Sequence, residues 1–244
     1  MTAPIGAIAA QTRIEVLLTL RRGENVLITL IVPVVLLVFF ASLGIVPAGP
    51  SAVSFLMPGM LALAVISTGM VSLGIATAYE RHYRVLKRLG GTPLPRAGLI
   101  AAKAISVLLL EIAQTVLLSG IAMLVYGWRP GAGFLPAIGV LLLGTAAFTG
   151  IGLAMAGGLR AEATLAGANG LYLVFLLLGD IVLPLDRLPL PLQLFARALP
   201  GAALTRSLRA VMTSGTGTLG LDLALLAAWA VAGLSVAAMT FRWD

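Results

Sequence analysis

Six long apolar segments divide this chain, and no other feature of the sequence restricts its fold as strongly. They are predicted at residues 26–46, 53–78, 99–126, 134–156, 163–183 and 219–239. Each is about as long as the ~20-residue α-helix needed to cross roughly 30 Å of hydrocarbon. Lipid offers no partners to backbone N–H and C=O groups, so such segments must be helical. The sequence therefore predicts an all-α membrane protein with six transmembrane helices.

The composition leaves little room for structure outside the membrane. Of the 244 residues, 60% are hydrophobic and 10% are charged, whereas soluble domains carry about 25% charged residues. We therefore interpret residues 1–244 as a single transmembrane domain. A net charge of +7 could suggest binding to nucleic acid. In so apolar a chain, however, basic residues are typical of cytoplasmic loops, and no nucleic-acid partner is expected.

Residue counts exclude several classes of catalytic and metal site. There are no cysteines, which excludes disulfides, thiolate metal sites and cysteine nucleophiles. The single histidine, His82, leaves no ordinary histidine-rich metal site or Ser/His pair. Neither Lys87 nor Lys103 follows a glycine-rich phosphate-binding loop. We expect a non-catalytic chain with no cofactor of its own.

Two segments outside the spans are predicted to lie in the membrane interface. Residues 1–24 combine an apolar stripe with a polar face at helical spacing, which favours an interfacial helix. The stripe comprises Ile14, Leu17 and Leu18, and the polar face comprises Gln11, Glu15 and Arg22. The alternative, a signal-peptide n-region, is disfavoured because the next apolar run is too long. Residues 184–218 are too apolar for a simple loop, so short helices lying in or dipping into the outer interface are expected.

The distribution of basic residues predicts the orientation of the chain. With the N-terminus inside, 11 of the 16 Lys and Arg residues are cytoplasmic: three before the first span, six in residues 79–103, and Arg160 and Arg242. The other 5 lie outside. Both termini are therefore predicted to be cytoplasmic, since basic residues concentrate on that side.

Residues 79–98 are predicted to form a cytoplasmic loop that contacts a soluble partner. Within residues 79–93 the spacing predicts a short amphipathic helix. Its charged face comprises Arg81, Arg84 and Arg88, and its other face comprises Tyr83, Leu86 and Leu89. The alternative interpretation is a basic anchor that is solvated by lipid headgroups.

This loop resembles the loop between the second and third spans of ABC type 2 exporter permeases. The matching residues are Glu80-Arg81, Leu86-Lys87-Arg88-Leu89 and Thr92-Pro93. Matches in the outer segment are Gly179, Pro184, Leu188-Pro189, Leu192-Gln193, Pro200 and Arg209, and the ending Phe241-Arg242-Trp243 is also similar. Among these permeases, the daunorubicin-resistance type is the most similar.

The resemblance implies a function and a set of partners. Two permease chains, identical or homologous, would form a pathway through the plasma membrane. A separate ATPase subunit would bind ATP and Mg and drive the transport. Coupling to that subunit would fall to the charged residues of the loop, which are Glu80, Arg81, Arg84, Lys87 and Arg88. The cargo would be a hydrophobic drug, antibiotic or lipid-like compound that is moved out of the cell.

Polar side chains inside the predicted spans are candidates for the pathway, because charge at membrane depth is costly. Glu111, Gln114 and Thr115 form a polar stripe in the third span. This stripe indicates either contact with the substrate or hydrogen bonding between helices. Asp180 and Asp222 lie near the outer ends of spans five and six, where pairing with Arg187, Arg197, Arg206 or Arg209 is expected. Small residues four apart, such as Gly152 and Ala156, predict close helix packing.

Three other functions fit parts of the sequence. An ATP-independent secondary transporter or a membrane scaffold could be equally apolar. An ion-coupled carrier usually has several acids at midplane depth, however, and here only Glu111 qualifies. A glycolipid or polysaccharide ABC exporter would be expected to line its route with aromatic residues, which make up 6% of this chain.

Overall fold

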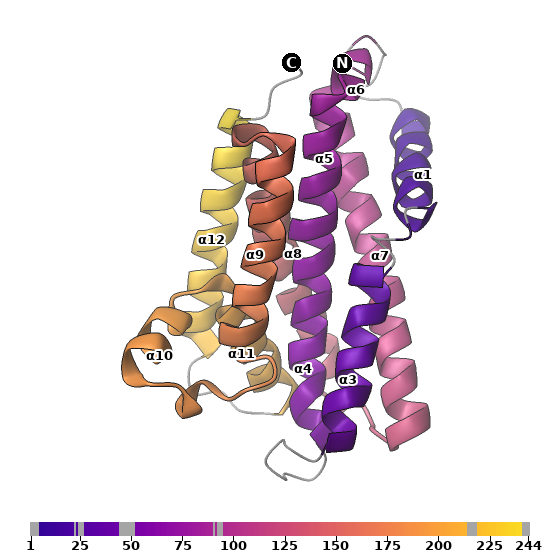
Figure 1. Ribbon diagram of the computed structural model, residues 1–244. Helices are drawn as coiled ribbons and strands as arrows, with labels where there is room; N and C mark the ends of the chain where they lie inside the picture. Colours follow the sequence, from indigo (N-terminus) through magenta and orange to yellow (C-terminus); the bar gives the residue numbers. More distant parts are fainter. Residues whose placement is uncertain are drawn as a thin grey trace.

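The computed structural model describes residues 5–21, 23, 27–43, 52–89, 91, 95–213 and 219–240. Helices account for most of this part of the chain, and no strand occurs in it. Most of the helices run along the long axis of an elongated bundle (Figure 1). The predicted all-α membrane fold is confirmed.

The chain alternates long helices with short ones. In order, the elements are α1 (Ile5–Arg21), η1 (Leu27–Ile31), α3 (Val32–Leu43), α4 (Ala52–Val65), η2 (Ile66–Ser72), α5 (Leu73–His82), α6 (Val85–Leu89), α7 (Arg96–Tyr126), α8 (Phe134–Gly158), α9 (Ala161–Leu178), η3 (Leu185–Arg187), α10 (Leu190–Arg197), α11 (Pro200–Met212) and α12 (Leu219–Thr240). The segments η1 and η2 are π-helical, and η3 is a 3₁₀ turn. Because no residue separates them, α4, η2 and α5 follow one another as a continuous helical stretch.

Within the described part of the chain, five helical stretches are long and apolar enough to cross a membrane. They are Ala52–His82, Ala97–Tyr126, Phe134–Gly158, Ala161–Leu178 and Leu219–Thr240. These stretches correspond to the second to sixth predicted spans. The first predicted span corresponds to η1 and α3, whose apolar part, Thr29–Leu43, is shorter.

The fifth span ends earlier than predicted, at Leu178 instead of Leu183. The chain leaves the helix at Gly179 and Asp180, and Asp180 has a φ angle of 57°. This left-handed conformation cannot continue a right-handed helix. The Oδ1 atom of Asp180 then accepts a hydrogen bond of 3.1 Å from the backbone N–H of Leu185, which stabilises the turn.

The continuous helix of α4, η2 and α5 lies at the centre of the bundle. In its most apolar stretch 89% of the residues are buried, compared with 22% in α12. Helix α8 packs against η2 and α5, while α3, α7 and α11 pack against α4. The centre of the core is therefore one helix that runs from one end of the molecule toward the other (Figure 1).

Glycines let α8 approach its neighbours closely. A Cβ atom placed on Gly152 would lie 2.8 Å from the carbonyl oxygen of Gly69 in η2. A Cβ atom on Gly150 would lie 2.7 Å from the backbone nitrogen of Leu234 in α12. Such close approach strengthens van der Waals contact where lipid provides no hydrophobic drive between helices. The predicted role of Gly152 in close packing is confirmed.

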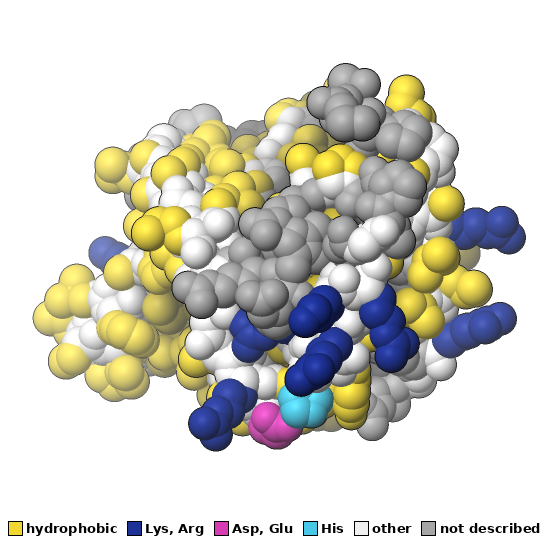
Figure 2. Space-filling model, turned by 90° about the horizontal axis from the view of Figure 1, so that it is seen from above, with side chains coloured by type: hydrophobic (Ala, Val, Ile, Leu, Met, Phe, Trp, Pro, Cys, Tyr) yellow, Lys and Arg dark blue, Asp and Glu magenta, His cyan; other side chains and the backbone are white. Residues whose placement is uncertain are grey.

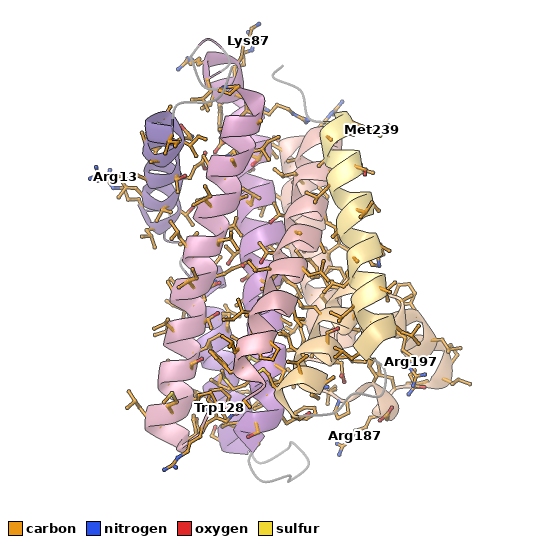
Figure 3. The ribbon with its side chains drawn as sticks, turned by 180° about the vertical axis from the view of Figure 1, so that it is seen from behind. Arg13, Lys87, Trp128, Arg187, Arg197 and Met239 are labelled. Carbon is orange, nitrogen blue, oxygen red and sulfur yellow. The ribbon has the colours of Figure 1, made fainter. Side chains whose placement is uncertain are left out.

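The two ends of the bundle carry different elements. Lys87 of α6 and Met239 of α12 lie at one end, whereas Trp128, Arg187 and Arg197 lie at the other (Figure 3). We call these the α6 end and the α10 end. Helix α1 lies beside α7 in the half of the molecule nearer the α6 end (Figure 1).

The short helices predicted within residues 184–218 are present as η3, α10 and α11. Pro184 and Pro189 directly precede η3 and α10, and Pro200 is the first residue of α11. Proline suits the first helical position of α11, because its fixed φ angle matches a first helical turn and its missing N–H would have no partner there. Helix α11 is packed against α4, α8 and α12.

Some predicted features lie outside the described residues. These are the Thr92-Pro93 match, the Phe241-Arg242-Trp243 ending, Arg22 in the polar face of the first helix, and residues 214–218 of the outer segment. The predicted helix of residues 1–24 is described as α1. Its buried residues are polar, Thr12 and Glu15.

Candidate functional site

The predicted amphipathic helix of residues 79–93 does not form as one helix. Helix α5 continues to His82, a turn follows at Tyr83 and Arg84, and α6 begins at Val85. Arg84 has a φ angle of 57°, which interrupts the helix. The prediction that Arg81, Arg84 and Arg88 share one helical face is therefore wrong, because the interruption places Arg81 and Arg88 on separate helices.

Helix α6 presents an exposed basic surface. Arg84, Lys87 and Arg88 are exposed to solvent, as are His82 and Tyr83. We call these five residues the α6 surface. Seen from the α6 end, Lys and Arg side chains gather beside the histidine on this face of the molecule (Figure 2). The rings of His82 and Tyr83 lie 5.1 Å apart in an edge-to-face arrangement. A cationic, partly aromatic surface of this kind can bind acidic groups of a partner.

A buried leucine anchors α6 to the rest of the protein. Leu86 is 1% exposed and clusters with Leu99 of α7 and with Ala7 and Ile8 of α1. The basic side chains on either side of it point away from this cluster into solvent. Leu86 therefore packs α6 against both α1 and α7.

Arg81 makes contacts different from those of the other basic residues in the segment. Its guanidinium donates hydrogen bonds to the carbonyl oxygens of Gly157 and Leu159, at the end of α8. Terminal helix carbonyls lack partners within the helix, and a cation there also interacts favourably with the helix dipole. Arg81 therefore joins α5 to the turn between α8 and α9.

Glu80 belongs to a buried ion network. The Nζ atom of Lys103 lies 2.7 Å from Glu80 Oε2 and 3.0 Å from Glu15 Oε1, and the lysine side chain is 1% exposed. Gln11 donates a hydrogen bond of 2.8 Å to the same Glu15 oxygen. The network joins α5, α7 and α1. Lys103, expected among the six basic residues of 79–103, lies inside α7 at the centre of this network.

The polar stripe of α7 makes contacts with several helices. Glu111 is buried and accepts a hydrogen bond from the hydroxyl of Thr145 in α8. Gln114 accepts one of 3.0 Å from Thr68 in η2. It also donates one of 2.5 Å to the carbonyl of Thr29 in η1. These contacts are those that the helix-pairing interpretation requires, and Thr115 beside them is half-buried.

At the α10 end, two arginines of α11 form the predicted ion pairs. Arg209 pairs with Asp180, and Arg206 pairs with Asp222 of α12 through a contact of 2.5 Å. The guanidinium of Arg209 also lies 4.1 Å from the ring centre of Phe55 in α4. Burial raises the pKa of Asp180 above its ordinary value, and the attraction of Arg209 opposes that shift. These contacts hold α11 against α4, α12 and the turn after α9.

The described residues contain no group of three or more His, Cys, Asp or Glu side chains that could hold a metal ion.

A family model described as ABC-2 type transporter matches residues 7–213. The matched region begins in α1 and ends directly after α11, so it covers well over half of the chain and includes the α6 surface. No curated protein matches the chain.

Proposed function

The chain belongs to the ABC-2 type transporter family, and from this premise we propose that it is the permease of an exporter driven by a separate ATPase. In this proposal, ATP and Mg bind to the ATPase partner. A second permease chain, identical or homologous, completes the pathway. The assembly lies in the plasma membrane with both termini in the cytoplasm. Its cargo is a hydrophobic drug, antibiotic or lipid-like compound.

The α6 surface is the observation that carries this proposal. Arg84, in the turn before α6, and Lys87 and Arg88, on α6 itself, are exposed, and Leu86 packs this helix against the bundle. A subunit that is driven by a soluble ATPase needs a docking surface that is both accessible and mechanically connected. Charge-assisted hydrogen bonds to acidic groups would provide the grip.

The contacts beneath this surface offer a route for movement from the ATPase to the spans. Glu80 and Lys103 connect α5 with α7, and Arg81 connects α5 with the end of α8. Because α5 continues through η2 into α4, displacement at α6 reaches the centre of the bundle. ATP-driven closure of the partner would then move packed helices between two arrangements. In this scheme Arg84, Lys87 and Arg88 contact the ATPase, while Glu80 and Arg81 transmit its movement.

The apolar character of the bundle supports a hydrophobic cargo. All five long spans have a high mean hydropathy. The polar stripe of Glu111, Gln114 and Thr115 is the candidate for contact with polar parts of the cargo. Such a contact would use the second oxygen of Glu111, because among the described residues Oε1 has no hydrogen-bond partner.

Charge reversal on the α6 surface tests the proposal. The triple variant Arg84→Glu, Lys87→Glu, Arg88→Glu should no longer co-purify with the ABC ATPase that accompanies the wild-type chain from its native membranes. The matched control reverses two exposed arginines of the α10 end, Arg187→Glu and Arg197→Glu, and should retain the ATPase.

Equal retention of the ATPase by the two variants would contradict the docking assignment.

Transport of hydrophobic fluorescent compounds, measured in vesicles with and without ATP, tests whether ATP is the energy source. Transport that persists at full rate after ATP depletion would favour a secondary transporter.

A further inference from the structure

Helix α1 does not fill the space along α7 completely. A groove of about 550 Å³ remains, lined by apolar side chains that include Ile8, Val16 and Leu17 of α1 and Ile105 and Leu109 of α7. Thr12 also borders the groove, but its hydroxyl donates a hydrogen bond of 2.9 Å to the carbonyl of Ile8. The walls of the groove are therefore almost entirely apolar.

One charged residue lines this groove. Arg13 is exposed, and it forms no ion pair within the described part of the chain. The acid nearest to it on α1, Glu15, is buried and paired with Lys103. Figure 3 shows Arg13 projecting from α1 away from the bundle. Arg13 lines the groove and its side chain points outward, so the cation is accessible at the outer edge of the groove (Figure 3).

We propose that this groove binds one acyl chain of an anionic phospholipid, with the phosphate of the headgroup held by Arg13. An apolar groove with a single cation at its edge complements an amphiphile that carries one negative charge at the end of a long hydrocarbon chain. Helix α1 also exposes the apolar side chains of Ile14 and Leu18. Exposed apolar side chains of this kind suit contact with membrane lipid. The membrane therefore supplies the phospholipid ligand at a high local concentration.

The charge makes the site selective among lipids. A basic residue near an anionic membrane surface contributes about 1 kcal/mol of attraction, which corresponds to about a fivefold change in affinity. We therefore expect the protein to retain phosphatidylglycerol about fivefold more strongly than phosphatidylcholine, which carries no net charge. The apolar walls supply the remainder of the binding through burial of CH₂ groups.

Native mass spectrometry of the full chain, purified in mild detergent after reconstitution with defined lipids, tests this site. Ala9→Trp places an indole in the groove and should abolish retention of phosphatidylglycerol. Its matched control, Ala10→Trp, changes the neighbouring residue, which is also exposed but does not line the groove. That variant should retain the lipid at the wild-type level.

The contribution of the charge is tested by a second pair of variants. Arg13→Gln should weaken phosphatidylglycerol retention about fivefold, whereas Arg21→Gln, at the other end of α1 from Ile5, should not. Equal retention by Ala9→Trp and Ala10→Trp overturns the groove as the site. Equal retention of phosphatidylglycerol and phosphatidylcholine by the wild type overturns the role of Arg13. Neither result depends on the ATPase, so the outcome is separable from that of the docking experiment.

Discussion

Lys103 places a positive charge between the carboxylates of Glu15 and Glu80, and only 1% of its side chain is exposed. Removing three charged groups from water is costly, and their mutual attraction offsets that cost only when each is well paired. Loss of the lysine would leave two like charges close together in a buried place. The network is therefore far more sensitive to loss of the cation than a surface ion pair is.

We predict that Lys103→Met lowers the free energy of unfolding by about 3–5 kcal/mol, the range found when one partner of a buried ion pair is removed. The measurement is unfolding of the purified protein in one detergent. The control is Lys87→Met on the exposed α6 surface, which should change stability by no more than about 0.5 kcal/mol. A third variant combines Lys103→Met with Glu15→Gln and Glu80→Gln, and it should recover much of the loss. The assignment is wrong if Lys103→Met is as mild as its control.

The sequence could reveal some ion pairs but not this one. Asp222 was predicted to pair with one of four arginines of the outer segment, and Arg206 is its partner. Glu15 is 88 residues from Lys103, and no local spacing reveals such a contact. The available signal was the position of Lys103 within the predicted third span, where a charge requires a partner.

Helix α8 lies close to η2 where they cross, and Gly152 of α8 has no side chain at this point. A methyl group on Gly152 would lie 2.8 Å from the carbonyl oxygen of Gly69 and 2.9 Å from that of Met70. Both of these are backbone atoms of the central helix, which cannot move aside alone. The two helices would therefore have to separate.

We predict that Gly152→Ala destabilises the protein by about 1–3 kcal/mol, as overpacking typically does. Its matched control is Gly139→Ala in the same helix, where a methyl group would meet nothing within 4 Å. That change should be neutral or stabilising by up to about 1 kcal/mol, because alanine favours the helix more than glycine does. Thermal unfolding of both variants in the same detergent measures the difference. If Gly152→Ala and Gly139→Ala unfold at the same midpoint, α8 and η2 can move apart at this crossing without loss of stability.

The helices themselves were predictable because their apolar length is a local property of the sequence. The break between α5 and α6 was not predictable, because neither Tyr83 nor Arg84 is a residue that usually ends a helix. Three residues after Tyr83, Leu86 is buried against α1 and α7. That contact joins segments from three parts of the chain, so its effect on the backbone appears only in the folded structure.

Exposed charged residues lie at both ends of the molecule, so its orientation in the membrane can be tested by labelling one residue at each end. The chain contains no cysteine, so a single introduced cysteine reports the position of one residue. We predict that Arg197→Cys reacts with a membrane-impermeant maleimide in intact cells. Lys87→Cys should react only after the membrane is permeabilised. Both positions are exposed, so access through the membrane decides the result. The reverse pattern would contradict cytoplasmic termini and the docking side proposed for α6.

The ion network at Lys103 also has a consequence for how the molecule is made. Synthesis proceeds from the N-terminus, so the ribosome completes Glu15 and Glu80 before Lys103. During that interval the nascent chain carries two carboxylates and lacks the cation that joins them. Arrival of α7 supplies the positive charge and fastens three separately made segments together. Translation that stops before residue 103 yields a fragment in which neither carboxylate has this partner.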